Sequence, residues 1–377
     1  MRIAVNTRFL LKGKLEGLGI YTQEIFSRLV RLMPEQEFYF FFDRPYDESF
    51  VFAENVIPVV VPPPARHPLL WYTWFEFSVP YYLKKHGIGL FISPDSYASL
   101  STAVPQILTI HDLGFEHFPG HVPLLERKYY RYFMPRFAQK AKQIVAVSDY
   151  TRHDIERQYH IPAEKIQTIY NGFDFDETAL AGVPVDELLQ QNALIQKEYF
   201  VFIGAVHPRK NVAGIVRAFE IFKQQTRSTY KLLLIGRNAW LNGELEKEIQ
   251  QSVFRNDIVW ITEIERNKLL KLLQTAYALV FPSFFEGFGI PVLEAMKLSV
   301  PVLTSNVSAL PEVSGDAALL CDPFQPEDIA AQMLRIVNDK SLYRDLAEKG
   351  KTRAKFFSWD KSAGQWSDLV RKQLRIK

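Results

Sequence analysis

Short runs of apolar residues recur along the chain and are bounded by turn residues. Each run is about four to six residues long and rich in Val, Ile, Leu and Phe, which is typical of a buried strand. Most runs are followed by roughly 10 to 16 residues whose apolar positions repeat near the helical period of about 3.6, which predicts a helix. Strands and helices that alternate in this way predict an α/β protein with parallel sheets and helical crossovers.

The predicted strands form two sets. In the first half of the chain they are 2–6, 38–42, 56–61, 90–93, 107–111, 144–148 and 166–170. In the second half they are 200–204, 231–236, 258–261, 278–282, 301–305 and 318–321. Between the two sets, residues 171–198 open on the turn pair Asn171-Gly172 and contain no predicted strand, so we place a domain boundary near residue 180.

The predicted domains are therefore residues 1–180 and 181–358. The last segment, 359–377, has the pattern of an amphipathic helix with no strand after it, so it must pack on a layer that is already formed. A length of 377 residues agrees with two domains, at about 100 to 200 residues per domain. Open parallel sheets bind nucleotides and second substrates in the loops at the carboxyl ends of their strands, so site residues are expected there.

Composition narrows the class of protein. Apolar residues make up 47% and charged residues 23%, as in an ordinary folded chain rather than a disordered, collagenous or coiled-coil one. The formal net charge of +3 gives no case for nucleic acid as a partner. The single cysteine, Cys321, excludes an intrachain disulfide and a cysteine-based metal cluster, and we expect it in a buried strand.

The chain start and its apolar windows predict a cytoplasmic protein. MRIAVNTRFL is typical of a strand and lacks the basic and apolar regions of a secretory signal. The most apolar window, 69–83, is too short to span a bilayer and contains Glu76 and Pro80. We expect a cytoplasmic location, with peripheral contact at the inner face of the membrane.

The most informative stretch is FPSFFEGFGIPVLEAM, residues 281–296. A predicted strand ends at Pro282, a glycine-containing loop follows, and Pro291 suits the first turn of a helix because it has no amide hydrogen to leave unbonded. Glycines let the backbone approach a ligand closely, and free amides at a helix start favour phosphate. Glu286 and Glu294 can accept sugar or ribose hydroxyls. The alternative is a glycine turn with a capping glutamate.

A basic pair follows another predicted strand. In FVFIGAVHPRKN, residues 200–211, the strand ends at Gly204, and Arg209 and Lys210 lie in the following loop. Two cations at the carboxyl end of a parallel strand suit a diphosphate, the arginine as a planar fork and the lysine as a point charge. The alternative is a solvated loop at a helix start.

Two further motifs in the first half are weaker. Gly17 and Gly19, in LEGLGIY, predict a tight loop of close approach before a helix over 21–32, but the full G-x-G-x-x-G of a dinucleotide site is absent. His111-Asp112 stands where a predicted strand ends and could reach a ligand, or His111 could merely cap the strand.

In combination these motifs resemble the family 4 retaining glycosyltransferases of GT-B fold. The likeness rests on the E-x7-E spacing in EGFGIPVLEAM, on PRKN, GLGIYT, TIHDLGFEHFP and VSDYTRHDI, and on VPVLTSNVSALPEVSGDAALLCDP. It covers nearly the whole chain. It implies two Rossmann-like domains facing an inter-domain cleft, the first for the acceptor and the second for the sugar nucleotide. It also implies that the segment after Trp359 crosses back to the first domain.

The resemblance implies roles for individual residues. Glu286 would contact the donor sugar and Glu294 the nucleotide ribose, while Arg209 and Lys210 would hold the diphosphate. His111 would reach the reactive face of the sugar. Backbone contacts to phosphate and sugar would come from Gly287, Phe288 and Gly289, and from Gly17 and Gly19 in the first domain.

The chain departs from the family pattern at two positions. Gly204-Ala205 stands where many members have Gly-Arg, so Arg209 would have to supply that cation, as in PRKN-type members. Ile20 stands where an arginine often follows the second glycine.

The predicted reaction is transfer of a hexose, with mannose from GDP-mannose as the best candidate. The acceptor would be a hydroxyl of a growing glycan or a lipid-linked acceptor, in surface polysaccharide or lipopolysaccharide biosynthesis, and the anomeric configuration would be retained. Cations and helix-start amides would stabilise the leaving diphosphate, so neither a metal nor a cofactor is expected. The alternatives are a phosphorylase, a nucleotide-sugar epimerase or a hydrolase on the same fold, and a non-enzymatic carbohydrate-binding module.

Two groups of side chains offer alternative metal sites. Asp174-Phe175-Asp176 is formally a D-x-D motif, although in the predicted connecting segment it is more typical of a solvated loop. The second group comprises His111, Asp112, His117 and His121, whose spacing matches no common ligand pattern.

The stretch 123–142 combines charge with aromatic rings. It contains six Lys or Arg residues against one acidic residue. Such a helix can lie on an anionic bilayer, or it can be a crossover helix with aromatic core residues and solvated charges. The interleaved rings are Tyr129, Tyr130, Tyr132, Phe133 and Phe137.

Overall fold

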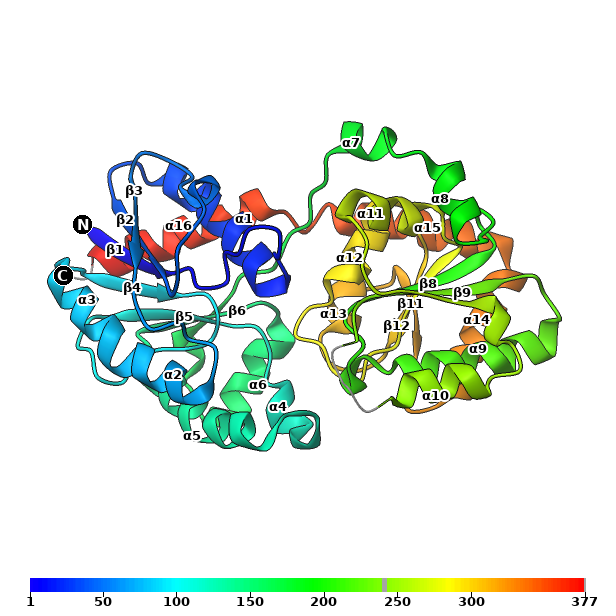
Figure 1. Cartoon of the computed structure of the whole chain (residues 1–377), viewed down its shortest axis with the longest axis horizontal. Helices are drawn as coiled ribbons and strands as arrows, with labels where there is room; N and C mark the ends of the chain where they lie inside the picture. The colour runs from blue at the N-terminus through cyan, green and yellow to red at the C-terminus, as the bar shows by residue number, and fades with distance from the viewer. Residues whose placement is uncertain (239–242, 376–377) are drawn as a thin grey trace. The chain divides into compact units, whose positions relative to one another are not determined.

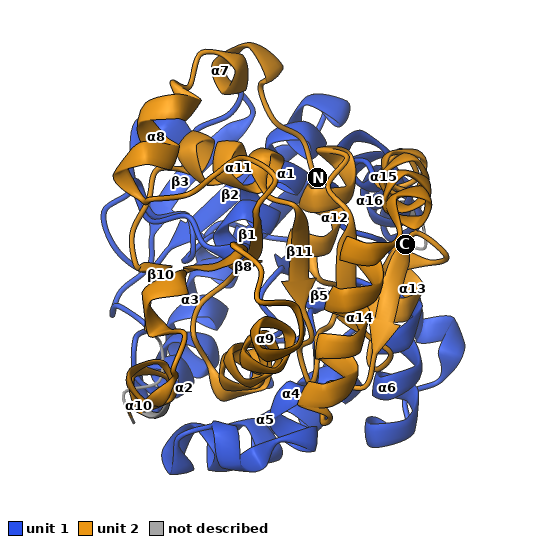
Figure 2. Cartoon of the chain, turned by 90° about the vertical axis from the view of Figure 1, so that its right-hand side faces the viewer, with its two compact units in different colours: residues 1–172, 358–377 blue, residues 173–357 orange. Residues whose placement is uncertain are grey.

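The computed structural model describes residues 1–238 and 243–375. The chain divides into two compact units, which Figure 2 colours separately. Unit 1 comprises Met1–Gly172 and Ser358–Lys377, and unit 2 comprises Phe173–Phe357. The change of unit at residue 172 lies inside the predicted connecting segment, 171–198, and the segment after residue 357 returns to unit 1.

Unit 1 contains a seven-stranded parallel sheet with the order β3-β2-β1-β4-β5-β6-β7. Every strand was predicted, with ends that shift by at most about two residues. From β1 the chain adds β2 and β3 on one side of the sheet and then β4 to β7 on the other. Strands β1 and β4 therefore flank the point at which the strand order reverses. The strands are β1 (Arg2–Asn6), β2 (Glu37–Phe42), β3 (Val56–Val60), β4 (Leu90–Ser93), β5 (Gln106–Ile110), β6 (Gln143–Ala146) and β7 (Ile166–Thr168).

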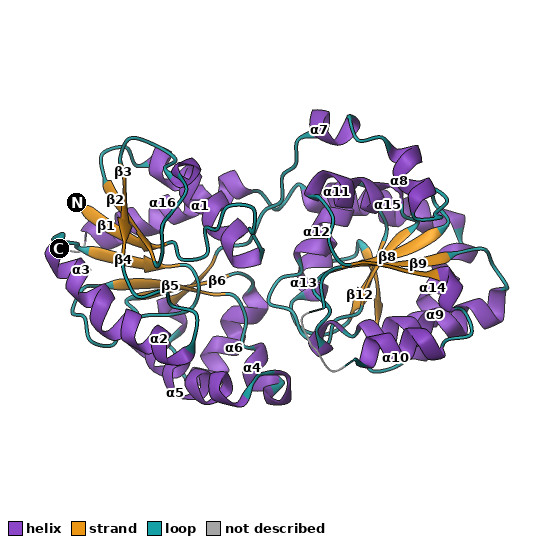
Figure 3. Cartoon of the chain, viewed as in Figure 1, coloured by secondary structure: helices purple, strands orange, loops and turns teal. Residues whose placement is uncertain are grey.

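Helices cover both faces of this sheet (Figures 1 and 3). One π-helical turn, η2 (Trp74–Ser78), joins α2 (Pro68–Thr73) to α3 (Val79–Lys85) as one helical segment. The other helices are α1 (Gly17–Leu32), α4 (Gly114–His117), α5 (Leu124–Lys140), α6 (Asp149–Tyr159) and α16 (Trp359–Arg375), with short 3-10 turns η1 (Glu48–Phe50), η3 (Pro119–His121) and η4 (Ala163–Lys165). The predicted last helix, 359–377, is confirmed to Arg375; its final two residues lie outside the described residues.

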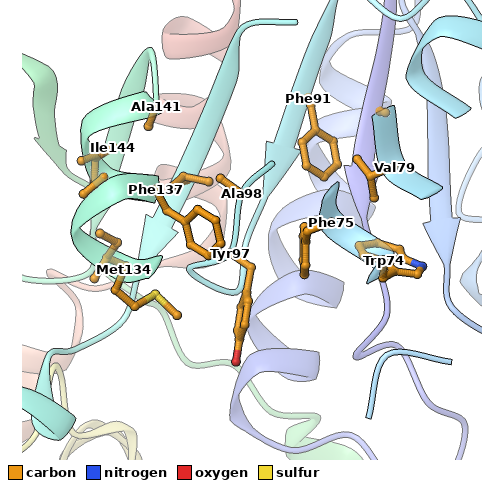
Figure 4. Packing of buried hydrophobic residues seen from close by; sticks show 14 of the residues in the cluster. Trp74, Phe75, Val79, Phe91, Tyr97, Ala98, Met134, Phe137, Ala141 and Ile144 are labelled. Atoms are coloured by element: carbon orange, nitrogen blue, oxygen red, sulfur yellow. The ribbon is translucent and has the colours of Figure 1, made fainter. Parts of the chain in front are cut away.

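The side chains of the strands alternate between two apolar layers. One layer packs against η2, α3 and α5, and Figure 4 shows Tyr97 among the buried residues of this layer, which include Phe75 and Phe137. The Tyr97 ring stacks on Phe75 with 5.3 Å between ring centroids. Phe75 and Phe137 are among the largest fully buried side chains of the described residues, and the predicted core role of Phe137 is confirmed.

The opposite layer is completed by the C-terminal helix. Trp366 of α16 is fully buried, and its ring lies 5.9 Å from that of Phe26 in α1. Its indole nitrogen donates a hydrogen bond to the Tyr21 hydroxyl at 3.0 Å. Helix α16 therefore packs on unit 1, as the sequence pattern and the family resemblance predicted.

Unit 2 contains a six-stranded parallel sheet with the order β10-β9-β8-β11-β12-β13. The change of direction here lies between β8 and β11. Each strand coincides with a predicted run, and Cys321 is a buried strand residue as expected. The strands are β8 (Tyr199–Ile203), β9 (Lys231–Ile235), β10 (Ile258–Ile261), β11 (Ala278–Phe281), β12 (Val302–Ser305) and β13 (Ala318–Cys321).

Helices α9, α10 and α14 lie on one face of this sheet, and α11, α12 and α15 on the other (Figure 1). The helices are α7 (Glu177–Ala181), α8 (Val185–Gln191), α9 (Val212–Thr226), α10 (Glu244–Gln251), α11 (Arg266–Thr275), α12 (Ile290–Lys297), α13 (Leu310–Ser314), α14 (Pro326–Asn338) and α15 (Lys340–Ala354), with 3-10 turns η5 (Pro208–Lys210) and η6 (Arg255–Asp257). Across the described residues, no helix is both long and apolar enough to cross a membrane.

Candidate active site

The predicted residues of unit 2 converge at the change of direction between β8 and β11. In open parallel sheets, the crevice at the carboxyl ends of such a strand pair is the usual place for a ligand. Arg209 and Lys210 follow β8, while Glu286 and Glu294 follow β11. Loops that are far apart in the sequence therefore meet at one edge of the sheet.

The loop after β8 begins at a close backbone contact. A Cβ on Gly236, which follows β9, would lie 1.9 Å from the carbonyl oxygen of Gly204. Gly204 and Gly236 each have a φ of 151°, a conformation that other residues rarely adopt. Glycine at both positions lets the loops after β8 and β9 run side by side.

The PRKN motif is anchored to the loop after β11. Asn211 is buried in a left-handed conformation, with a φ of 56°. Its side-chain amide donates to the carbonyl oxygens of Pro282 at 3.2 Å and Pro323 at 2.7 Å. The amide of Phe284 donates to the carbonyl of Arg209 at 2.9 Å. These bonds hold Arg209 and the Glu286 loop together.

Two cations surround the buried carboxylate of Glu286. Lys210 Nζ donates a hydrogen bond to Glu286 Oε1, and Lys210 also lies 5.0 Å from the centroid of the Phe281 ring. Arg209 places its guanidinium 3.7 Å from Glu286 Oε2 and donates to the carbonyl of Phe285 at 3.0 Å. Two positive charges and one negative charge leave the group net positive, as an anion site requires.

The backbone between Glu286 and α12 is fixed by its neighbours. The Glu286 amide donates to Ser308 Oγ at 3.1 Å, and the Glu286 carbonyl accepts from Ala309. Gly289, with a φ of 99°, leads into the helix, and a Cβ there would lie 2.6 Å from a Leu310 methyl. The Phe288 ring packs against Phe357, with 5.5 Å between centroids. The expected contribution of Gly287, Phe288 and Gly289 is through the backbone at the start of α12.

Glu294 lies on α12 and is almost fully buried. Its Oε1 accepts from the guanidinium of Arg266, the first residue of α11. Its Oε2 is buried and has no hydrogen-bond partner among the described residues. Because a buried acceptor without a donor costs free energy, this oxygen is suited to a hydroxyl donor supplied by a ligand.

His111 lies one residue beyond β5 in unit 1. Its Nε2 is 2.7 Å from the carbonyl oxygen of Pro94, and its ring meets Tyr21 edge-on at 4.8 Å. A carbonyl only accepts, so Nε2 carries the hydrogen and Nδ1 of the neutral ring is an acceptor. Burial lowers the pKa of the His111 imidazole below its usual value. The ring is therefore neutral at neutral pH.

The prediction of a loop at Gly17 and Gly19 is wrong. Both residues belong to the first turn of α1, which begins at Gly17 rather than near Tyr21. A Cβ on Gly19 would lie 2.6 Å from the carbonyl oxygen of Phe9, so a glycine is needed for the close packing of α1 on the loop after β1. The helix can start earlier because Gly19 avoids this contact, whereas the usual helix-weakening effect of both glycines suggested a loop.

The alternative metal ligands have other partners. His117 Nε2 lies 2.8 Å from Asp154 Oδ2, and Asp112 Oδ1 accepts from the amide of Gly114. Asp174 pairs with Lys297, and Asp176 caps α7 through the amides of residues 178 and 179. The described residues contain no group of three or more His, Cys, Asp or Glu side chains placed to hold a metal ion.

Two residues at this site were not among the predictions. Asn211 belongs to the PRKN motif, and a buried asparagine after a basic pair could have indicated a loop anchor. Arg266 gives no such signal, because its partner Glu294 lies on a different helix.

Two family profiles match the chain. "Glycosyltransferase Family 4" matches residues 15–177, and "Glycosyl transferases group 1" matches residues 185–353. O-antigen chain mannosyltransferase B of Escherichia coli is 33% identical over 259 residues, which cover 69% of this chain and 68% of that protein. The chain belongs to the family 4 glycosyltransferases. It is thus an enzyme that transfers a hexosyl group.

Other similar proteins agree with this family. The O-antigen chain mannosyltransferase RfbU of Salmonella typhimurium is 25% identical to this glycosyltransferase over 282 residues, which cover 74% of each chain. Among solved structures, sucrose-phosphate synthase from Thermosynechococcus elongatus superimposes with a TM-score of 0.78 at 18% identity, over 100% of both chains. The fold is GT-B, as the sequence motifs predicted.

Proposed function

We propose that this glycosyltransferase moves a mannosyl residue from GDP-mannose to a hydroxyl of a growing glycan in the synthesis of a surface polysaccharide. The observation that carries the proposal is the net positive group formed by Arg209, Lys210 and Glu286 at the carboxyl ends of β8 and β11. The sugar is taken from relatives named as O-antigen chain mannosyltransferases. The acceptor is a glycan or a lipid-linked glycan.

The diphosphate lies against Arg209 and Lys210, close to the start of α12. When the bond between the anomeric carbon and the phosphate oxygen breaks, negative charge develops on the leaving diphosphate. Cations and helix-start amides already in place stabilise that charge without reorganising. The proposal therefore includes neither a metal nor a cofactor, and undiminished activity in the presence of EDTA is its test.

The two glutamates orient the donor. Glu286, held by the two cations, accepts hydroxyls of the mannosyl group. Glu294 offers Oε2 to the ribose hydroxyls, which gives that oxygen the partner it lacks in the part of the chain that the structure describes. For unit 1, we propose His111, with Nδ1 as an acceptor, as a contact of the sugar, and the amides at the α1 start near Gly17 and Gly19 as further contacts of the donor.

Transfer proceeds with retention of the anomeric configuration. The acceptor oxygen attacks the anomeric carbon on the face from which the diphosphate leaves. The acceptor proton passes to the departing phosphate oxygen, so GDP and the new glycosidic bond are the products. No protein side chain forms a covalent intermediate in this route.

A donor screen tests the proposal. GDP-mannose should raise the melting temperature more than UDP-glucose or ADP-glucose at equal concentration, because a ligand that binds the folded state stabilises it by mass action. Release of GDP should depend on an added mannose disaccharide, and the one-bond carbon–proton coupling at the new anomeric centre should report an α-mannoside. Stronger stabilisation by a UDP or ADP sugar would overturn the choice of donor, and a β-mannoside would overturn retention.

A further inference from the structure

One side of unit 1 exposes an unusual number of apolar side chains. Among the described residues, sixteen large hydrophobic side chains are exposed, and eight of these lie on α2, η2, α3 and α5. They include Leu69, Phe77, Tyr81, Leu124 and Tyr132. Single exposed apolar residues are ordinary, whereas a cluster of this kind marks an interaction surface.

Aromatic side chains connect these helices. Helices α2 and α5 are in contact (Figure 1). The Tyr72 ring lies 5.9 Å from Phe77 and 5.9 Å from Phe133, and Phe133 lies 4.9 Å from Tyr132. Contacts between aromatic rings therefore connect η2 to α5 through α2. We call this surface, formed by residues 66–86 and 123–142, the α2–α5 face.

Buried side chains fix the shape of the α2–α5 face from below. Trp71 packs edge-on against Tyr129 at 5.4 Å and stacks on Tyr130 at 6.0 Å. Trp74 is fully buried and donates to the carbonyl of Val61 at 2.7 Å. The exposed residues therefore project from a rigid helical layer that belongs to the core of unit 1.

The same face is strongly basic. Residues 66–86 and 123–142 contain nine Lys or Arg and only two acidic residues, against a net charge of +3 for the whole chain. One of the two, Glu76, is buried and accepts from the amide of Leu100 at 2.9 Å and from the Ser101 hydroxyl. Lys84, Lys128 and Arg131 are exposed. The α2–α5 face thus combines apolar side chains with a large local excess of positive charge.

We propose that the α2–α5 face binds the surface of an anionic lipid bilayer. Apolar and aromatic side chains enter the headgroup region, while lysine and arginine side chains contact lipid phosphates, as in other interfacial helices. A second copy of the same basic face would be repelled by it, so self-association is the less suitable occupant. The proposal extends the predicted contact of residues 123–142 to α2, η2 and α3.

Vesicle cosedimentation of the whole chain tests the proposal. The probes are vesicles of phosphatidylcholine alone and of phosphatidylcholine with about one third phosphatidylglycerol. The protein should sediment with the anionic vesicles at low salt, and much less with neutral vesicles or at high salt. Neither donor nor acceptor is added, so a failure here leaves the proposed glycosyl transfer untouched.

Matched variants distinguish binding through the α2–α5 face from non-specific hydrophobic binding. Leu69→Ser with Phe77→Ser removes side chains that are 68% and 61% exposed, and Ile195→Ser with Val253→Ser removes side chains of unit 2 that are 60% and 75% exposed. The first pair should reduce binding to anionic vesicles by about tenfold or more, and the second pair should leave it unchanged. Because all four side chains are exposed, both proteins should fold.

A charge pair gives a second contrast. Lys128→Gln with Arg131→Gln should weaken binding to anionic vesicles, whereas Lys351→Gln with Lys355→Gln, exposed in unit 2, should not. Equal losses in face and control variants would overturn the proposal, as would absence of cosedimentation at every salt concentration. Concentration-dependent dimers that disappear in the Leu69→Ser, Phe77→Ser protein, without vesicle binding, would assign the face to a second copy instead.

Discussion

The two units place an ion pair at the same topological position and surround it differently. In unit 1, Arg8 follows β1 and pairs at 2.6 Å with Asp95, which follows β4. In unit 2, Lys210 follows β8 and pairs with Glu286, which follows β11. Each pair spans the two strands at which the strand order of its sheet changes direction.

The difference lies in what surrounds the pair. Arg8 and Asp95 are only 4% and 2% exposed, and the Arg8 guanidinium lies over the rings of Phe9 and Tyr97 at 4.8 and 4.3 Å. Lys210 shares Glu286 with a second, partly exposed cation, Arg209. In unit 1 the carboxyl ends of the two strands therefore hold a buried ion pair with no net charge. In unit 2 the same position carries excess positive charge.

The largest expected effect is the loss of stability when the buried Arg8–Asp95 pair is broken. Arg8→Ala leaves the Asp95 charge buried without its partner, which should lower the free energy of unfolding of unit 1 by about 3–5 kcal/mol. Denaturant unfolding followed by tryptophan fluorescence measures the change. Arg8→Met combined with Asp95→Asn removes both charges and keeps an acceptor for Ser93, so it should recover much of the loss. A loss below about 1 kcal/mol for Arg8→Ala would show that both pairs are equally dispensable for stability.

Substitutions in the group formed by Arg209, Lys210 and Glu286 should lower activity rather than stability. Lys210→Ala or Arg209→Ala should lower turnover by roughly 100- to 1000-fold, because each removes a charge that stabilises the leaving diphosphate. Stability should change little, since one cation still neutralises Glu286. Lys297→Ala, which breaks an exposed pair with Asp174 in the same unit, is the matched control and should retain full activity. Near-normal rates in both site variants would remove these residues from the reaction.

A smaller effect, on KM for the donor, is expected from a change at Glu294 Oε2. Both oxygens of Asp95 accept hydrogen bonds, whereas Glu294 Oε2 accepts none from residues 1–238 and 243–375. Glu294→Gln keeps the shape of the side chain but replaces an acceptor by a donor, so KM for the donor should rise by about tenfold, with little change in stability. Steady-state kinetics with varied sugar nucleotide measures it. An unchanged KM would mean that Oε2 does not face the ribose.

The smallest effect concerns two histidines of unit 1. Burial lowers the pKa of His111, whereas the hydrogen bond to Asp154 raises the pKa of His117. His111 should therefore contribute stability that is full above the unfolded value of about 6.5 and is lost as pH falls, while the His117 contribution is full below that value and lost as pH rises through its folded pKa. Proton NMR titration should show His111 titrating below His117. The reverse order would contradict both assignments.

Much of the fold was predictable because parallel strands buried on both faces are nearly continuous apolar runs. Val201, Leu233 and Leu279 have no solvent-facing neighbours to break the pattern, so strand positions in both units followed from hydrophobicity alone. Helix starts were harder to predict, because Gly17 and Gly19 disfavour a helix locally, and the close packing that requires Gly19 against Phe9 is visible only in the structure.

The candidate site was predictable where its residues lie in loops directly after predicted strands. Arg209, Lys210 and Glu286 stand in loops directly after strands, and the topology brings such loops together. Arg8 also follows a strand, but no pattern in the sequence distinguishes a buried arginine paired with Asp95 from an exposed one. Arg266 could not be found because its role depends on the placement of α11 beside α12.

The return of α16 to unit 1 has a consequence for synthesis of the chain. Unit 2 is formed by continuous sequence, so all its strands have left the ribosome once residue 357 has emerged. Unit 1 begins first, yet it lacks Trp366 and the rest of α16 until the last segment is made. The side chains of Phe26 and Tyr21, which contact Trp366 in the complete unit, therefore lack this partner throughout translation of unit 2, at about 5–20 residues per second. The domain that is translated first is completed last.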